Sequence, residues 1–148
     1  MLLTIERVAL LKTVDIFAET PDYVLASVAR IIEEVELAPG ETFIQQGEVG
    51  DDMYLIIQGK VRVHNGDRTI IVLGPGESVG EFAILDPEPR SASVTAEESA
   101  LLFRIDKAPF DEVMANRPEI AQGINRVLVR RLREQGRLFA ESRGAEPE

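Results

Sequence analysis

The stretch 80–94 concentrates residues whose types and spacing could bind a charged ligand. It begins with Gly80 and Glu81, passes through a short apolar turn, and reaches Arg90. Backbone N–H groups at a helix start favour an anion, and a planar guanidinium matches phosphate oxygens. The carboxylate of Glu81 would repel a phosphate, so we expect it to face a pair of hydroxyl groups. Phosphate and diol together indicate a nucleotide.

The same stretch resembles the phosphate-binding cassette of the cyclic nucleotide-binding domain family. That cassette has a Gly-Glu start with an alanine two residues on, a variable loop, and an arginine followed by small residues. The resemblance covers roughly residues 14–135 and includes ordered glycines in the segments 47–51, 53–63 and 73–77. Val79 departs from the pattern, because the family often has an aromatic residue there, and this departure affects packing more than chemistry.

The resemblance implies a binding site and a ligand. Arg90 is expected to bind the phosphate and Glu81 the ribose hydroxyls, while Ser91 and the N–H groups of Ala83 and Ser91 are secondary phosphate donors. Threonine at the Ser91 position is the clearer mark of guanine, so cyclic AMP is favoured over cyclic GMP. No metal or cofactor and no enzymatic activity are expected. The predicted ligand-binding residues are Gly80, Glu81, Phe82, Ala83, Arg90, Ser91 and Ala92.

Composition limits the classes of protein that remain. The 148 residues suit one domain with a real core, and the absence of cysteine excludes disulfides and thiol catalysis. No apolar run approaches the length of a membrane helix, and the start does not resemble a signal peptide, so we expect a cytoplasmic protein without membrane contact. A net charge of −10 argues against nucleic acid as a partner of this chain.

The order of elements predicts an α+β, mainly β fold. Short β-branched runs separated by turn residues indicate an antiparallel β-barrel or jelly roll, with Asn65-Gly66 as a type I′ hairpin turn. The predicted segments are N-terminal helices over 1–34, the barrel over 35–105, C-terminal helices over 106–140, and a flexible tail over 141–148. The expected strands are 35–37, 42–45, 52–58, 60–64, 69–73, 90–96 and 101–105.

Helix signals flank the barrel. Thr20 and Asp106 are predicted to cap helices that follow them, the first of which should run to about residue 33. The last helix is basic, which indicates either a solvated face or a surface toward an acidic partner or the ligand. Its apolar stripe predicts a homodimer through this helix. The stripe comprises Ile120, Ile124, Val127 and Leu128, and the arginines are Arg126, Arg130, Arg131, Arg133 and Arg137.

Three functional classes fit these features. The first is a cyclic nucleotide sensor acting on an unidentified effector. The second is a regulator of the catabolite-activator type, whose helix-turn-helix domain would need more chain than follows the last helix. The third is a degenerate module that keeps the fold for interaction or dimerisation. His64 has no companions for a metal site and is expected to be exposed, and no nucleophile–base pair or Walker loop is present. We favour the sensor, since Glu81 and Arg90 are both intact.

A mechanism follows from the apolar cassette turn. Phe82, Ile84 and Leu85 need packing partners outside the barrel, and the helices after it offer Phe110, Val113, Ile120 and Ile124. Alternate barrel positions are core by default, so Val61, Val63, Ile71 and Leu73 are left out of the site. Capture of phosphate is expected to pull the cassette inward and to move the last helix with it.

Overall fold

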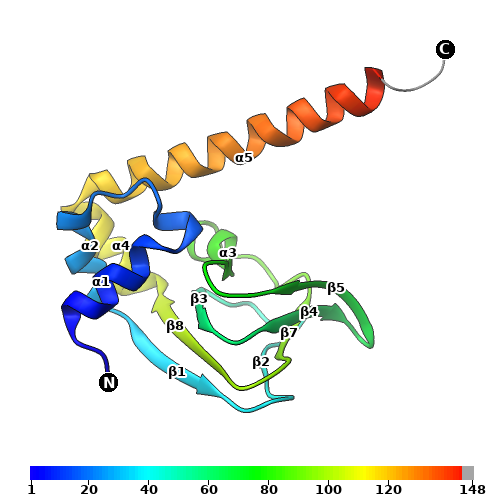
Figure 1. Cartoon of the computed structure of the whole chain (residues 1–148), viewed down its shortest axis with the longest axis horizontal. Coiled ribbons are helices and arrows are strands. Elements are labelled where there is room, and N and C mark those ends of the chain that lie inside the picture. The colour runs from blue at the N-terminus through cyan, green and yellow to red at the C-terminus, as the bar shows by residue number, and fades with distance from the viewer. Residues whose placement is uncertain (145–148) are drawn as a thin grey trace.

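The computed structural model describes residues 1–144, apart from the side chains at positions 82 and 144. Figure 1 shows the strands gathered on one side and the helices on the other, with α5 crossing both and projecting beyond them. The helices are α1 (Thr4–Lys12), η1 (Asp15–Phe17), α2 (Asp22–Ala29), α3 (Glu81–Leu85), α4 (Lys107–Asn116) and α5 (Pro118–Gly144). The strands are β1 (Glu33–Leu37), β2 (Thr42–Ile44), β3 (Asp52–Gln58), β4 (Val61–Asn65), β5 (Arg68–Leu73), β6 (Ser78–Val79), β7 (Ser93–Ala96) and β8 (Ala100–Asp106).

These strands form two antiparallel sheets that face each other. One sheet has the order β1-β8-β3-β6 and the other β2-β7-β4-β5. Alternation along the strands turns apolar side chains inward, so that Ile56, Val61, Val79 and Val94 share one barrel core. The predicted α+β, mainly β class and the antiparallel barrel of jelly-roll type are confirmed.

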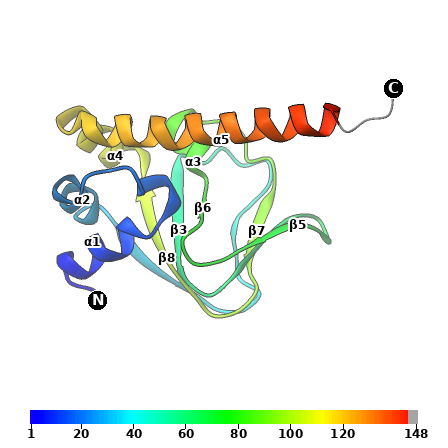
Figure 2. The ribbon, with the colours of Figure 1, turned by 45° about the horizontal axis from the view of Figure 1, so that its top comes forward.

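A second core lies between the barrel and the helices. Strand β3 serves both cores, because Tyr54 and Ile56 face the barrel while Met53 and Leu55 face the helices. Figure 2 shows α5 lying across α4 and α3, and α1 and α2 stacked below it. The first half of α5 is held by burial of its apolar stripe in this helical core.

Close packing fixes α5 against the segment before α2. A Cβ atom at Gly123 would lie 2.8 Å from Thr20 Oγ1 and 3.0 Å from the Glu19 carbonyl. Thr20 is fully buried there, and its hydroxyl has no hydrogen-bond partner in the described structure. The prediction that Thr20 caps α2 is therefore wrong, since the N-cap is Pro21 and α2 ends at Ala29.

Several other predicted details differ from the structure. Asp106 stands at the N-cap of α4 without a side-chain capping bond, because its carboxylate pairs with Arg104 at 3.1 Å. The type I′ turn at Asn65-Gly66 is wrong, since the turn is Gly66-Asp67 and only the glycine has a positive φ. The η1 turn and strand β6 were not predicted.

The chain near the C-terminus is more helical than predicted. Helix α5 continues to Gly144, past the expected end at residue 140. Residues 145–148 of the predicted tail lie outside the described residues. None of the described helices is both long and apolar enough to cross a membrane.

Candidate functional site

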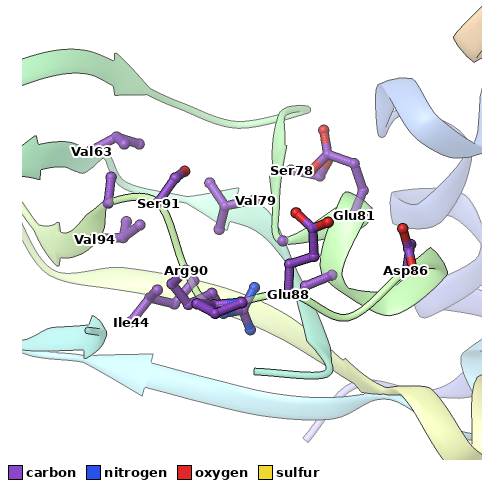
Figure 3. A pocket seen from close by; sticks show the side chains of 14 residues that line it. Ile44, Val63, Ser78, Val79, Glu81, Asp86, Glu88, Arg90, Ser91 and Val94 are labelled. Carbon is purple, nitrogen blue, oxygen red and sulfur yellow. The ribbon is translucent and has the colours of Figure 1, made fainter. Parts of the chain in front are cut away.

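A pocket of about 360 Å³ opens between the cassette and the barrel. Four apolar side chains form one wall, namely Ile44, Val63, Val79 and Val94. Polar groups of α3 and of the loop after it stand opposite that wall (Figure 3). A pocket that combines an apolar wall with a few charged groups suits a small polar ligand with one flat apolar part.

The predicted site residues meet at this pocket. Its lining includes Gly80, Glu81, Ala83, Arg90, Ser91 and Ala92, while the Phe82 side chain lies outside the described residues. Ser91 is exposed and Ala83 is buried. The contiguous stretch 80–94 therefore folds back on itself so that its two charged ends, Glu81 and Arg90, face one space.

The prediction that Arg90 opens a strand is wrong, because Arg90 lies in a loop before β7. Its N–H donates to the Glu48 carbonyl, and its own carbonyl accepts from the Gly47 N–H, each at 2.9 Å. The loop before β3 thus takes the place of a neighbouring strand. These two bonds fix the backbone from which the guanidinium extends.

Asp52 holds the Arg90 guanidinium. Nη2 donates to the Asp52 carbonyl at 3.0 Å and to Asp52 Oδ1 at 2.5 Å. The Arg90 side chain is 9% exposed, and within residues 1–144 its Nε and Nη1 atoms donate to no other group. Two donor atoms of a preset guanidinium therefore remain for an anionic ligand.

Two glycines leave room for this guanidinium. A Cβ atom at Gly50 would lie 2.3 Å from Arg90 Nε, and one at Gly80 would lie 2.7 Å from Arg90 Nη1. Gly80 also has a φ of 83°, a conformation that other residues adopt rarely. Any side chain at Gly50 would push the Arg90 head group out of its place.

Asp52 also joins Arg90 to a wider network. Its Oδ2 accepts from Arg104 Nε at 2.9 Å and from the Tyr54 hydroxyl at 3.2 Å. Burial and the neighbouring Asp52 charge raise the pKa of Tyr54 to about 12. The Arg104 pKa is also raised, because its carboxylate partners outweigh the opposing effect of burial. One carboxylate therefore serves two arginines and a phenol.

Glu81 forms an ion pair with α5 rather than with the barrel. Its Oε1 accepts from Arg131 Nη1 at 3.2 Å, and Arg131 Nη2 donates to Asp15 of η1 at 2.7 Å. Burial alone would lower the Arg131 pKa, but the Asp15 and Glu81 carboxylates raise it above its ordinary value. The sequence predicts Arg131 only as one of several arginines on a surface that faces solvent, an acidic partner or the ligand. The structure brings it to the edge of the pocket.

The far end of α3 is also attached to the helices. Ile84 lies in the helical core with Phe110, Ile120 and Ile124, as predicted. Lys107 Nζ at the start of α4 donates to the Ile84 carbonyl at 3.0 Å. Leu85 is 36% exposed, so the prediction that it packs in this core is wrong.

Other residues differ from their predicted places. Val63 lines the pocket, which corrects the prediction that it is a core residue outside the site. His64 is half-buried rather than exposed, and its ring nitrogens bond the Gly66 carbonyl and the Thr95 hydroxyl, each at 2.7 Å. Among the described residues no group of acidic, histidine or cysteine side chains could hold a metal ion.

Comparison with known proteins places this geometry in a family. Residues 34–117 match the cyclic nucleotide-binding domain. The CRP-like cAMP-activated global transcriptional regulator of Mycobacterium tuberculosis is 31% identical over 131 residues, covering 85% of this chain and 58% of that protein. The cyclic AMP receptor protein of Thermus thermophilus is 37% identical over 69% of this chain and 54% of that protein. The chain thus spans somewhat more than half the length of these two relatives.

A solved structure supports the same assignment. The N-terminal domain of a transcriptional regulator from Streptomyces coelicolor A3(2) matches with a TM-score of 0.77 and 32% sequence identity. The match covers 87% of this chain and 93% of that domain. The family match extends over more than half of the sequence and includes the whole cassette. The chain therefore belongs to the cyclic nucleotide-binding domain family.

Proposed function

We propose that the chain is a regulatory domain that binds a cyclic nucleotide, with cyclic AMP preferred over cyclic GMP, and that has no catalytic activity of its own. One observation carries the proposal. The Arg90 guanidinium and the Glu81 carboxylate face one pocket whose opposite wall is apolar. Arg90 would bind the phosphate, Glu81 the ribose hydroxyl, and the wall of valines and Ile44 the base.

The link from Glu81 to α5 supports transmission of ligand occupancy. A ribose hydroxyl that donates a hydrogen bond to Glu81 would weaken the ion pair between Glu81 and Arg131, whose Nη1 lies 3.2 Å from the Glu81 carboxylate. Ile84 connects the cassette to the first half of α5 through the helical core. A ligand can bias the position of α5 only by its different affinity for two arrangements, typically about 1–3 kcal/mol.

Titration calorimetry with both cyclic nucleotides tests the binding step. We expect one site per chain, with tighter binding of cyclic AMP. Hydrogen exchange in residues 119–135 is then compared with and without saturating ligand, and we expect it to change. Exchange that changes only in residues 80–94 would mean that the chain binds without switching. Absence of binding by either nucleotide would favour the degenerate interaction module.

A homodimer through α5 belongs to the same proposal, although on different residues from those predicted. Ile120, Ile124 and Val127 are buried within the chain, so they are not free for a partner. The second half of the helix, residues 132–143, is exposed throughout. Most helical stability comes from packing of an apolar face, so a covering surface would stabilise this half.

Three of the exposed apolar residues of α5 lie along one seam of the helix. Val129, Leu132 and Phe139 follow one another at spacings typical of a coiled coil, with Gly136 between the last two and open space beside it. We expect Leu132→Glu to reduce the mass measured by light scattering at high micromolar concentration from dimer to monomer. Leu138→Glu, which lies off this seam, is the control. A monomeric parent protein would reject the dimer.

The predictions of an unidentified effector, of a cytoplasmic location, and of no contact with nucleic acid or membrane stay predictions.

A further inference from the structure

The charges around the pocket do not balance. Among the described residues that line it, three carry carboxylates and one carries a guanidinium: Glu81, Asp86, Glu88 and Arg90. Arg90 is already paired with Asp52, which lies behind it at 2.5 Å. A site built only to attract phosphate would not surround its single arginine with acids.

Within residues 1–144, Glu88 and Asp86 differ from Glu81 in forming no ion pair. Glu81 forms an ion pair with Arg131, whereas neither Asp86 nor Glu88 forms an ion pair within residues 1–144. Figure 3 shows the Glu81 and Glu88 carboxylates turned toward the same opening, with Asp86 just beyond the end of α3. Any second negative charge on a ligand would therefore meet a Glu88 carboxylate that no ion pair within residues 1–144 neutralises.

The backbone holds Glu88 beside the phosphate arginine. Pro89, between Glu88 and Arg90, forms a β-bridge with Val49, and the Arg90 N–H donates to the Glu48 carbonyl at 2.9 Å. The loop that presents the guanidinium thus also presents the carboxylate. Asp86 lies earlier in the loop, just after α3, and has no such anchor among these bonds.

The charge of a nucleotide depends on its phosphate. A cyclic phosphodiester carries one negative charge at neutral pH. A phosphomonoester loses a second proton near a pKa of about 6 and carries a charge of about −1.5 to −2 at pH 7. One arginine can balance the first kind of ligand but not the second.

We propose that the pocket selects a monoanionic phosphodiester over a phosphomonoester by charge, and that Glu88 sets this selectivity. The inference rests on the proposed function, because it concerns which nucleotide enters the same site. It gives the chain a means to reject linear nucleotides that share the base and the ribose with its ligand. The ring of the cyclic phosphate is then not the only feature that is recognised.

The experiment compares Glu88→Gln with the parent protein and uses three ligands. These are cyclic AMP, AMP, and the 5′-methyl phosphate ester of adenosine, which is linear but carries one charge. Glutamine keeps the size of the side chain and removes only the charge. We expect the affinity for AMP to rise about three- to tenfold more than the affinities for the two monoanions. Glu98→Gln, an exposed carboxylate outside the pocket, is the control and should not alter this ratio.

Two results would overturn the inference while leaving the proposed function intact. In the first, AMP and its methyl ester bind the parent protein equally weakly, and Glu88→Gln changes neither affinity relative to that of cyclic AMP. The shape of the phosphate ring alone would then determine the selectivity. If all three ligands gain equally in the variant, Glu88 repels anions without selecting among them. Failure of the parent protein to bind cyclic AMP would instead overturn both the proposed function and this inference.

Discussion

The two charged ends of the cassette are fixed to different parts of the molecule. Arg90 is held by Asp52, a residue of the barrel itself, and its side chain is 9% exposed. Glu81 is held by Arg131 on α5, and through it by Asp15 on η1. One end is therefore held by a strand of the barrel, and the other by a helix that packs on the sheet from outside. Under the proposed function we therefore expect Arg90 to supply most of the affinity and Glu81 to transmit binding to α5.

The largest effect is expected at the Arg90 end. Arg90→Ala should weaken cyclic nucleotide binding by at least about 2–3 kcal/mol, the scale of a lost charge-assisted pair with the phosphate. Calorimetric titration of the variant and the parent measures this loss. Equal affinities would remove the phosphate role of Arg90 and, with it, the basis of the comparison.

A variant with a smaller expected effect tests the position of the Arg90 guanidinium separately from its charge. Gly50→Ala puts a Cβ atom where Arg90 Nε now lies, so the flexible head group must move while every charge stays. We expect binding to weaken by about 1–2 kcal/mol with little loss of stability, because the φ of Gly50 is not positive.

Gly74→Ala is the matched control for that variant. A Cβ atom at Gly74 has no neighbour within 4 Å, so the ligand affinity should not change. If Gly50→Ala binds as tightly as the control, a preset position of Arg90 is not needed.

The sequence predicts the cassette well because the cassette is contiguous. Residues 80–94 carry both charged ends, and a short helix followed by a loop brings them to one pocket without help from distant segments. Strand β3 begins and ends as predicted, since its apolar run over residues 53–57 is uninterrupted and a glycine follows Gln58.

The residues that hold the cassette could not be predicted in this way. Asp52 is separated from Arg90 by 38 positions, and Arg131 from Glu81 by 50. Asp52 reads as an ordinary strand start and Arg131 as one arginine of a basic helix. An apolar stripe such as that of Ile120 and Ile124 likewise predicts that one helix face is covered, but it does not identify the covering surface. The stripe therefore suggested a dimer, whereas in the structure it packs in the helical core of the same chain. The tertiary fold decides such pairings.

The Glu81 end is tested with a variant of its partner. Arg131→Ala should change the affinity by less than about 1.4 kcal/mol, because Arg131 does not line the pocket. We expect it to reduce the ligand-induced change in hydrogen exchange over residues 119–135. Arg133→Ala, on an exposed position without an ion pair in the described structure, should keep that response. An undiminished response in Arg131→Ala would place the coupling in the Ile84 contacts instead.

The smallest effect concerns the network behind Arg90. The chain has two tyrosines, so in a Tyr23→Phe protein the ultraviolet absorbance of phenolate reports Tyr54 alone. We expect a midpoint of about 12, because burial and the Asp52 charge raise the pKa of Tyr54. An unfolded tyrosine ionises near 10, so the stabilising contribution of this group is complete below pH 10 and is lost as the pH rises through about 12. Asp52→Asn removes the neighbouring charge but not the burial, so the midpoint should fall yet stay above that of a free tyrosine. Circular dichroism over the same range shows whether the chain is still folded at each midpoint. An unchanged midpoint in Asp52→Asn would mean that burial alone sets the pKa and that Asp52 does not bond Tyr54 in solution.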